Sequence, residues 1–285
     1  MLYLSSFTFP SEDEEWEYRK SVQRRCYNTI YPFYVLPKTG LSQVIFAPVT
    51  IFYGGNGSGK STALNAIAEK LNLRRDAPFN RSNFFEDYVK MCSYSLDEPV
   101  PEESAIVTSD DVFDFMLNLR ALNDGVDRKR EELFDEYYRL KDGEGFRLRS
   151  MDDYDRLRRI VTARRQTQSA FVRENLPSGA QGHSNGESAD LFFKSRILDD
   201  TLCLLDEPEN SLSPKKQAEL AKYLSESVRY CGCQLVISTH SPFLLAMEGA
   251  KIYNLDDHAN VARSWTELDN VKVYFDFFEK RRSEF

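Results

Sequence analysis

The chain has 285 residues, of which 41% are hydrophobic and 13% aromatic, so it is long enough to bury a sizeable core. Its formal net charge of −8 excludes a surface that is basic everywhere, and any contact with nucleic acid needs a local patch. Its apolar runs are shorter than the roughly 18 residues of a membrane span, and its five cysteines form no CxxC pair. These features predict a globular, cytoplasmic protein with reduced thiols and no membrane segment.

Residues 1–110 are predicted to form a sheet-rich lobe that ends in a strand. Its strand-like runs, separated by acidic, Pro or Gly breaks, read "LYLSSFTF", "TIYPFYVL", "SQVIF" and "VTIFY". The next residues, 61–71, predict a helix with Leu64, Ile67 and Leu71 on one face. The run "SAIVTS" at 104–109 predicts another strand.

Residues 111–178 predict a helical insertion. Val112, Phe115 and Leu119 keep helical spacing, "KDGEG" breaks it, and residues 151–175 predict a second long helix. Between Arg147 and Arg173, eight arginines stand against three aspartates. This excess is common on a solvated helix face, and it is also the composition of a surface for nucleic acid or an acidic partner, so both interpretations stay open over 147–173.

Residues 179–285 alternate between strands and helices and are expected to complete the same α/β domain. Strands are predicted at "TLCLL", "QLVIS" and "KIYNL". Helices are predicted at 214–230, after Pro242, and around "VKVYFDFFEKRR". Ser213 followed by Pro214 is a favourable helix start.

A phosphate-binding loop is predicted between the strand "VTIFY" and the helix that follows it. The glycines of "GGNGSGKST" let the backbone wrap around phosphates, Lys60 can reach the β- and γ-phosphate oxygens, and Ser61 can bind Mg²⁺. The residues expected to contact the nucleotide are Gly54, Gly55, Asn56, Gly57, Ser58, Gly59, Lys60, Ser61 and Thr62.

Polar residues also follow two other apolar runs. Asp206 and Glu207 end "TLCLLDE", where an acidic pair faces the crevice at the carboxyl edge of a parallel sheet. We expect Asp206 to bind Mg²⁺ and Glu207 to polarise the attacking water. His240 follows "QLVIST" and should project at the same edge. Taken alone, Asp206 and Glu207 could be an exposed charged strand end, and His240 could be a structural histidine. Together with a phosphate loop, the three residues predict an ATP-hydrolysing site.

The order of these motifs resembles the ATP-binding-cassette (ABC) class of ATPases, in particular the soluble branch with RecF, the structural-maintenance-of-chromosomes proteins and the OLD nucleases. The phosphate loop comes first, followed by "HSNGES" at 183–188, Asp206-Glu207 and His240. The resemblance implies an α/β P-loop NTPase fold of ABC type, with a mixed N-terminal sheet lobe, a parallel-sheet core and an inserted helical subdomain.

The same resemblance implies that "HSNGES" is the signature loop. In this class the loop opens a helix whose N-terminus binds the γ-phosphate of ATP held by a second copy. Ser184, Gly186 and Glu187 are the residues carried over to this role. The resemblance therefore implies ATP and Mg²⁺ as ligands and a homodimer closed around ATP.

The chain departs from the class at several positions. His183 stands where Leu is common, Asn185 replaces a glycine, and Ser213 replaces an aspartate. The glutamine that usually follows the phosphate loop has no clear counterpart, and Ser109 or Asp110 lies at the corresponding strand end. The aromatic residue that packs on adenine stays open among Tyr27, Tyr31 and Tyr34.

Three functions are consistent with these motifs. The first is a soluble ATPase that dimerises around ATP and acts on DNA or a nuclease-like effector protein, in genome maintenance or phage defence. The second is the ATP-binding subunit of a membrane transporter, which the arginine-rich insertion and the missing glutamine disfavour. The third is a regulatory switch with negligible hydrolysis, which the presence of Glu207 and His240 disfavours.

Overall fold

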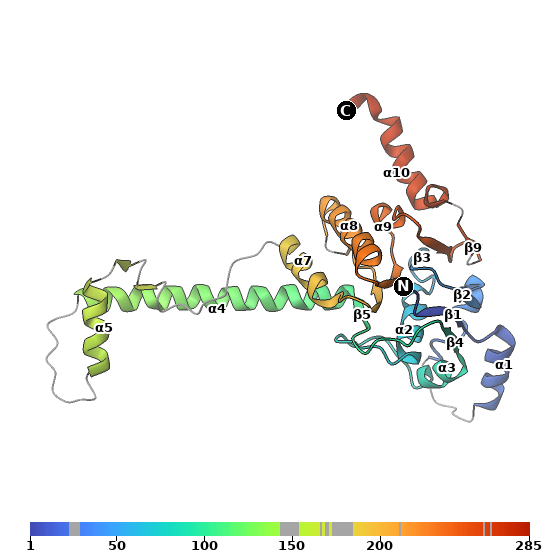
Figure 1. Cartoon of the computed structure of the whole chain (residues 1–285), viewed down its shortest axis with the longest axis horizontal. Coiled ribbons are helices and arrows are strands. Elements are labelled where there is room, and N and C mark those ends of the chain that lie inside the picture. Colours follow the sequence, from blue (N-terminus) through green and yellow to red (C-terminus); the bar gives the residue numbers. More distant parts are fainter. Residues whose placement is uncertain are drawn as a thin grey trace. The chain divides into compact units, whose positions relative to one another are not determined.

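The computed structural model divides the chain into two compact units. Unit 1 comprises residues 1–113 and 189–285, and unit 2 comprises residues 114–188. Figure 1 traces the chain through its elements. The residues that the structure describes are 1–22, 29–142, 154–165, 167–168, 171–172, 185–210, 212–258, 260–262 and 264–285.

A small antiparallel sheet belongs to unit 1. Its central strand β1 (Leu4–Thr8) pairs with β2 (Gln43–Ile45) and β4 (Ser93–Leu96). Helix α1 (Glu12–Ser21) follows β1, η1 (Pro37–Thr39) precedes β2, and α3 (Phe85–Met91) precedes β4. The strand predicted at "TIYPFYVL" is wrong, because turns occupy this stretch and Pro32, after a cis peptide bond, has no N–H to donate to a sheet.

A six-stranded sheet forms the centre of unit 1. Its order is β5 (Ala105–Thr108), β6 (Leu202–Asp206), β7 (Gln234–Ser238), β3 (Val49–Tyr53), β8 (Lys251–Asn254) and β9 (Asn260–Val261). The first five strands are parallel and β9 is antiparallel. Strands β3 and β7 are buried along their whole length, which explains their continuous apolar sequences.

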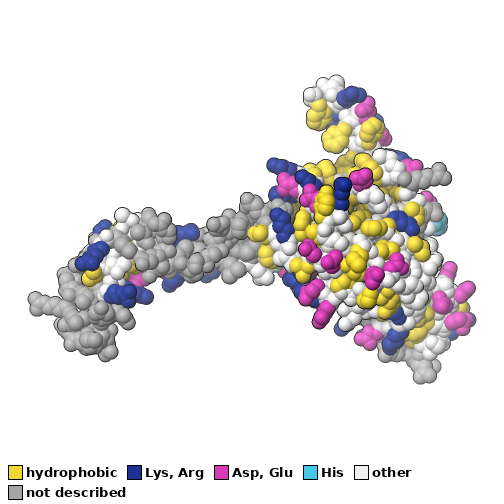
Figure 2. Space-filling model, in the orientation of Figure 1, with side chains coloured by type: hydrophobic (Ala, Val, Ile, Leu, Met, Phe, Trp, Pro, Cys, Tyr) yellow, Lys and Arg dark blue, Asp and Glu magenta, His cyan; other side chains and the backbone are white. Residues whose placement is uncertain are grey.

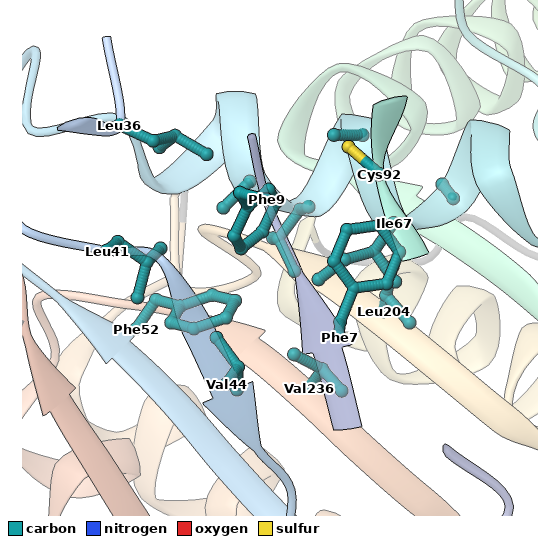
Figure 3. Packing of buried hydrophobic residues seen from close by; sticks show 14 of the residues in the cluster. Phe7, Phe9, Leu36, Leu41, Val44, Phe52, Ile67, Cys92, Leu204 and Val236 are labelled. Carbon is teal, nitrogen blue, oxygen red and sulfur yellow. The ribbon is translucent and has the colours of Figure 1, made fainter. Parts of the chain in front are cut away.

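Unit 1 also contains further helices. They are α2 (Lys60–Lys70), α7 (Asn185–Arg196, which begins in unit 2), α8 (Pro214–Tyr230), α9 (Pro242–Leu245), η3 (Trp265–Glu267), α10 (Asp269–Lys280) and η4 (Arg282–Glu284). Figure 3 shows Phe7 of β1, and Phe9 just after this strand, packed with Ile67 of α2 and with Leu204 and Val236 of the large sheet. The two sheets and α2 therefore share one hydrophobic core.

A buried glutamine also joins the two sheets of unit 1. The Gln234 side-chain oxygen accepts the backbone N–H groups of Tyr3 and Leu4, each at 2.8 Å. Its side-chain nitrogen donates to the Leu4 carbonyl at 2.8 Å. Because all of these polar groups are satisfied, this cross-link fixes β1 beside the start of β7 without leaving a buried donor unpaired.

Unit 2 contains most of α4 (Ser109–Asp142) and α5 (Tyr154–Arg165). Its small core consists of Leu133 and Tyr137 of α4, Ala163 of α5, and Phe171 and Val172. The helix predicted over 151–175 is described as α5, which ends at Arg165, and Thr167 is not helical. Most of the remaining residues of that prediction lie outside the described ranges.

Charged side chains are mixed on the visible face of unit 1. Figure 2 shows Lys and Arg side chains interspersed with Asp and Glu side chains over this face. The face that the figure shows is therefore mixed in charge.

Candidate functional site

The phosphate loop lies between β3 and α2, as the sequence predicts. Gly59 precedes α2 with a φ of 90°, and no side chain caps this helix end. A Cβ at Gly59 would lie 2.8 Å from the Leu36 side chain, and one at Gly57, whose φ is 83°, would meet no described atom within 4 Å. The first N–H groups of α2 have no intrahelical acceptor, so they are donors of the kind that a bound phosphate satisfies.

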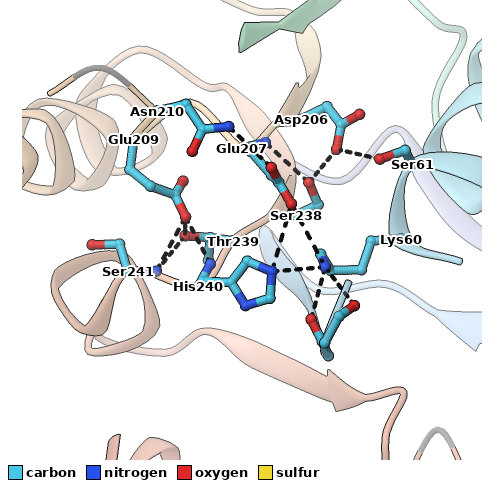
Figure 4. Close-up of polar contacts among 12 residues, drawn as sticks. Lys60, Ser61, Asp206, Glu207, Glu209, Asn210, Ser238, Thr239, His240 and Ser241 are labelled. Atoms are coloured by element: carbon cyan, nitrogen blue, oxygen red, sulfur yellow. Dashed lines mark hydrogen bonds and ion pairs between the residues drawn. The ribbon is translucent and has the colours of Figure 1, made fainter. Parts of the chain in front are cut away.

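Lys60 occupies the centre of the site and is 4% exposed. Its Nζ donates to the carbonyl oxygens of Gly54 at 2.7 Å and Gly55 at 3.1 Å. It also lies 2.9 Å from His240 Nε2 and 3.6 Å from Glu207 Oε1 (Figure 4). This contact places the imidazole ring of His240 directly beside the ammonium group of Lys60.

The sheet order brings three sequence motifs together. Strands β6, β7 and β3 are neighbours, so the ends of the strands that carry Asp206, His240 and the phosphate loop meet at one edge. Ser61 Oγ donates to Asp206 Oδ1 at 3.1 Å, and Ser238 Oγ donates to the same oxygen. Burial raises the pKa of Asp206 against the effect of these two hydroxyl groups.

Glu207 turns its carboxylate toward Lys60 and His240 (Figure 4). Its φ of 49° is left-handed, which is costly for a side chain with a Cβ. Two hydrogen bonds fix the conformation, because the Glu207 N–H donates to both the carbonyl and the hydroxyl of Ser238 at 3.0 Å. The contact with His240, a hydrogen bond from Asn210 and the charge of Lys60 outweigh burial and lower the pKa of Glu207 to about 2. Glu207 is therefore ionised at neutral pH.

Glu209 is a site residue that the sequence analysis missed. Its Oε1 accepts the Thr239 hydroxyl at 2.6 Å, the His240 N–H at 2.7 Å and the Ser241 N–H at 3.1 Å. The residue is 7% exposed, and its second oxygen is buried with no partner in the described part of the chain. The sequence shows a second acidic residue two positions after Glu207. Its hydrogen-bond partners follow the neighbouring strand β7, so they are known only from the structure.

The residues at this edge fit ATP with Mg²⁺. The Ser61 hydroxyl and the Asp206 carboxylate lie side by side, and Mg²⁺ is commonly held by one or two protein oxygens together with phosphate oxygens. Within the described ranges, no cluster of three or more His, Cys, Asp or Glu residues could enclose a metal by itself. The donor set therefore matches an ion that phosphates help to coordinate.

The chain has an ABC-type P-loop fold. This follows from the phosphate loop on the central strand β3, the parallel order β5-β6-β7-β3-β8, and the antiparallel sheet packed on the same core. The predicted fold class is confirmed.

A family model described as "AAA domain, putative AbiEii toxin, Type IV TA system" matches residues 191–246. These residues contain β6, α8, β7 and α9, and with them Asp206, Glu207 and His240. No match to a curated protein was found.

Two solved structures illustrate the kind of protein to which the chain is similar. One is the Smc head domain from Pyrococcus furiosus, with an extended coiled coil, bound to the C-terminal domain of ScpA. It is 16% identical, the match covers 84% of this chain and 95% of that one, and the TM-score is 0.38. The other is cbiO1 from Clostridium perfringens, part of the ABC transporter complex cbiONQ. It is 14% identical, with coverages of 85% and 88% and a TM-score of 0.40.

The signature loop is only partly described. Ser184 lies outside the described residues. Gly186 and Glu187 lie in α7 as it is described, from Asn185 onward, and their side chains are not described. The assignment of the signature loop and its contact with a second copy stay predictions.

The structure also locates most of the residues whose roles the sequence analysis left open. Tyr31 donates to or accepts from the Thr62 hydroxyl at 3.1 Å, which brings it to the first turn of α2. The backbone N–H of Tyr34 binds Glu15, and Tyr27 lies outside the described ranges. Ser109 is the first residue of α4. Ser213 caps α8 by position, but its side chain makes no capping hydrogen bond.

The basic stretch is described in part. Helix α5 exposes Arg158, Arg159 and Arg165, and Arg159 forms an ion pair with Glu136 at 3.0 Å. Arg147 and Arg173 lie outside the described residues. None of the helices in the described ranges combines the length and apolar character needed to cross a bilayer.

Proposed function

We propose that this chain is a Mg²⁺-dependent ATPase that converts ATP and water to ADP and phosphate. The observation that supports this best is the convergence of Lys60, the Ser61–Asp206 pair, Glu207 and His240 at the ends of three adjacent parallel strands. A structural salt-bridge network would not need the uncapped helix end and the Gly-rich loop beside it.

Each residue has a distinct task in this proposal. Lys60 exchanges the carbonyl oxygens of Gly54 and Gly55 for β- and γ-phosphate oxygens, which are stronger acceptors because they are charged. Ser61 and Asp206 would hold Mg²⁺, which neutralises charge that develops on the phosphates. The ionised Glu207 accepts a hydrogen bond from the attacking water and orients it. His240 Nε2, released from Lys60, faces the γ-phosphate.

The proposed active form is a homodimer around ATP. Ser184, Gly186 and Glu187 of one copy would contact the γ-phosphate bound by Lys60 of the other. The support is the motif order and the place of Gly186 and Glu187 in α7 as it is described, from Asn185 onward. The active dimer then acts on or with a macromolecule.

We infer that this macromolecule is DNA or a nuclease-like effector protein, in genome maintenance or phage defence. The exposed arginines of α5 support a polyanionic partner. The description of the family model that matches residues 191–246 mentions a toxin, which supports a role together with an effector protein. The transporter alternative has less support, because it does not account for the arginine-rich insertion.

Trapping ATP tests the proposal. Glu207→Gln should cut turnover by on the order of 10²–10⁴-fold while leaving the phosphate contacts in place. At a concentration at which the nucleotide-free chain is monomeric, this variant with ATP and Mg²⁺ should double its mass in light scattering. Adding Ser184→Arg should abolish the dimer, because the bulky side chain enters the γ-phosphate position. If neither ATP nor Ser184→Arg changes the measured mass, the assignment of residues 183–188 as the signature loop is wrong.

A further inference from the structure

The first turn of α10 is attached to unit 1 by buried apolar residues. Leu268, just before the helix, is 1% exposed, and Val271 in its first turn is 7% exposed. Asn270 lies between these two residues and is half-buried. Because the chain is buried on both sides of Asn270, the position of this residue relative to the rest of unit 1 is fixed.

The backbone N–H of Asn270 binds the end of the strand that leads into the phosphate loop. The first N–H groups of a helix have no acceptor within it, and here the Tyr53 hydroxyl accepts the N–H of Asn270 at 3.1 Å. Tyr53 is the last residue of β3 and directly precedes Gly54. Its ring also packs edge-on against the imidazole of His240, with 6.3 Å between the ring centres. The start of α10 is therefore anchored at the candidate site itself.

The side chain of Asn270 holds the backbone of His240. Its amide nitrogen donates to the His240 carbonyl at 2.9 Å. A carbonyl oxygen only accepts hydrogen bonds, so the nitrogen of the amide, and not its oxygen, must face it. This contact links α10 to the residue that lies beside Lys60 and Glu207.

The backbone groups of His240 are thus held by two different elements. Glu209, which follows β6, accepts the His240 N–H at 2.7 Å, and Asn270 of α10 donates to the His240 carbonyl. The imidazole lies 2.9 Å from Lys60 Nζ and 3.5 Å from Glu207 Oε1. Because small displacements of a catalytic group reduce the rate strongly, the hydrogen bonds that fix its backbone affect turnover.

We propose that Asn270 is a positioning residue for His240 and that it makes ATP turnover depend on the attachment of α10. The inference rests on the proposed ATPase function, in which His240 faces the γ-phosphate. Asn270 acts through the backbone of His240, so its replacement should slow the chemical step and leave phosphate binding intact. A displacement of α10 that breaks this hydrogen bond would slow turnover in the same way, which makes α10 a regulatory element of the site.

Steady-state kinetics and ATP binding of two variants test this inference. Asn270→Ala removes the contact, and the isosteric Asn270→Asp places a carboxylate oxygen against the His240 carbonyl, where two acceptors repel each other. Each variant should lower kcat about tenfold and keep the Kd for ATP within about twofold. The loss should be smaller than in Glu209→Ala, because Glu209 still holds the His240 N–H. Asp269→Ala is the matched control, since the Asp269 side chain is 95% exposed one position earlier and should leave kcat unchanged.

A double-mutant cycle separates positioning from a general loss of structure. If Asn270 acts through His240, Asn270→Ala should change kcat by less than about twofold in a His240→Ala background. A merely structural effect would instead add to the effect of His240→Ala. Additive effects, or an unchanged kcat in both Asn270 variants, would overturn the inference.

Amide hydrogen exchange of the nucleotide-free chain gives a measurement that does not depend on ATP hydrolysis. Asn270→Asp should speed exchange over residues 239–245, which contain the turn around His240 and α9, and should leave exchange in α8 unchanged. If the wild-type chain does not hydrolyse ATP, the proposed function fails, whereas the exchange data still show whether Asn270 fixes this turn. Equal exchange over 239–245 in the variant and the wild type would overturn the inference.

Discussion

The carboxylate of Glu209 holds the backbone of His240. Glu209 Oε1 accepts the His240 N–H at 2.7 Å, although the two residues follow different strands, β6 and β7. The same oxygen accepts the Thr239 hydroxyl and the Ser241 N–H, so the turn on both sides of His240 is fixed to one carboxylate. Glu209 is therefore a positioning residue for the histidine that faces Lys60 and Glu207.

Replacing Glu209 should affect the positioning of His240 but not the binding of ATP. Glu209→Ala should lower kcat for ATP by on the order of 10²-fold, because small displacements of a catalytic group have effects of this size. The KM should change little, since the phosphate loop is intact. Glu209→Gln keeps an oxygen acceptor and should retain most of the activity. Steady-state kinetics measure the effect, with Glu219→Ala on the exposed face of α8 as control. Full activity in Glu209→Ala would refute the role.

Lys60 should be required for nucleotide binding. Lys60→Ala removes the only cation within 4 Å of Glu207 Oε1 among the described lysine and arginine side chains, and with it the group that contacts the phosphates. We expect loss of ATPase activity and of most ATP binding, measured with a fluorescent ATP analogue, in a protein with an unchanged circular dichroism spectrum. Lys70→Ala, at the other end of α2, is the matched control. Unchanged turnover in Lys60→Ala would rule out the assignment.

If the basic stretch binds nucleic acid, its affinity should depend on the salt concentration. If α5 meets nucleic acid, binding with ATP present should weaken steeply as salt rises, and each lost phosphate contact should reduce the log–log slope by about 0.9 on duplex DNA. Arg158→Gln/Arg165→Gln should flatten the slope, whereas Arg229→Gln on α8 should not. If no binding to DNA or RNA is detected at low salt, α5 is an ordinary solvated helix and not a nucleic-acid surface.

Glu15 should make stability depend on pH. Burial, with a smaller contribution from Glu12, raises its pKa to about 7 against the hydrogen bond from the Tyr34 N–H. Between about pH 4.5 and pH 7, the Glu15 carboxyl group therefore holds a proton in the folded chain that it has lost in the unfolded chain. The free energy of unfolding should therefore fall as pH rises from about 4.5 to 7, by at most about 3.5 kcal/mol at about 1.4 kcal/mol per pKa unit.

Glu15→Gln should remove this decline, as measured by urea unfolding at pH 5 and pH 8. The control is Glu14, whose pKa is lowered by its hydrogen bonds with Ser11. Its contribution has the opposite sign, because it is present above pH 4.5 and is lost in acid. Glu14→Gln should therefore leave the decline between about pH 4.5 and pH 7 in place. An unchanged decline in Glu15→Gln would show that another group causes it.

Local sequence was sufficient for the phosphate loop and for several elements. Strand, Gly-rich turn and helix are contiguous from Val49 to Lys70, so their chemistry is visible without distant contacts. The helix at 214–230 also follows from its periodicity and its proline start. Helix α1 was missed because its charged sequence lacks an apolar stripe, although the Ser11–Glu14 capping box marks its start.

The assembly of the site required the tertiary structure. An apolar strand that ends in Asp206 or precedes His240 does not specify its neighbours, because parallel strands pair through long-range hydrogen bonds that leave no local pattern. The order β6-β7-β3 decides that Asp206 meets Ser61 and that Glu209 reaches His240. The attachment of α10 to the His240 carbonyl through Asn270 is likewise a contact between distant segments. The sequence by itself determined which chemical groups are present, and only the packing of the sheet decided which of them touch.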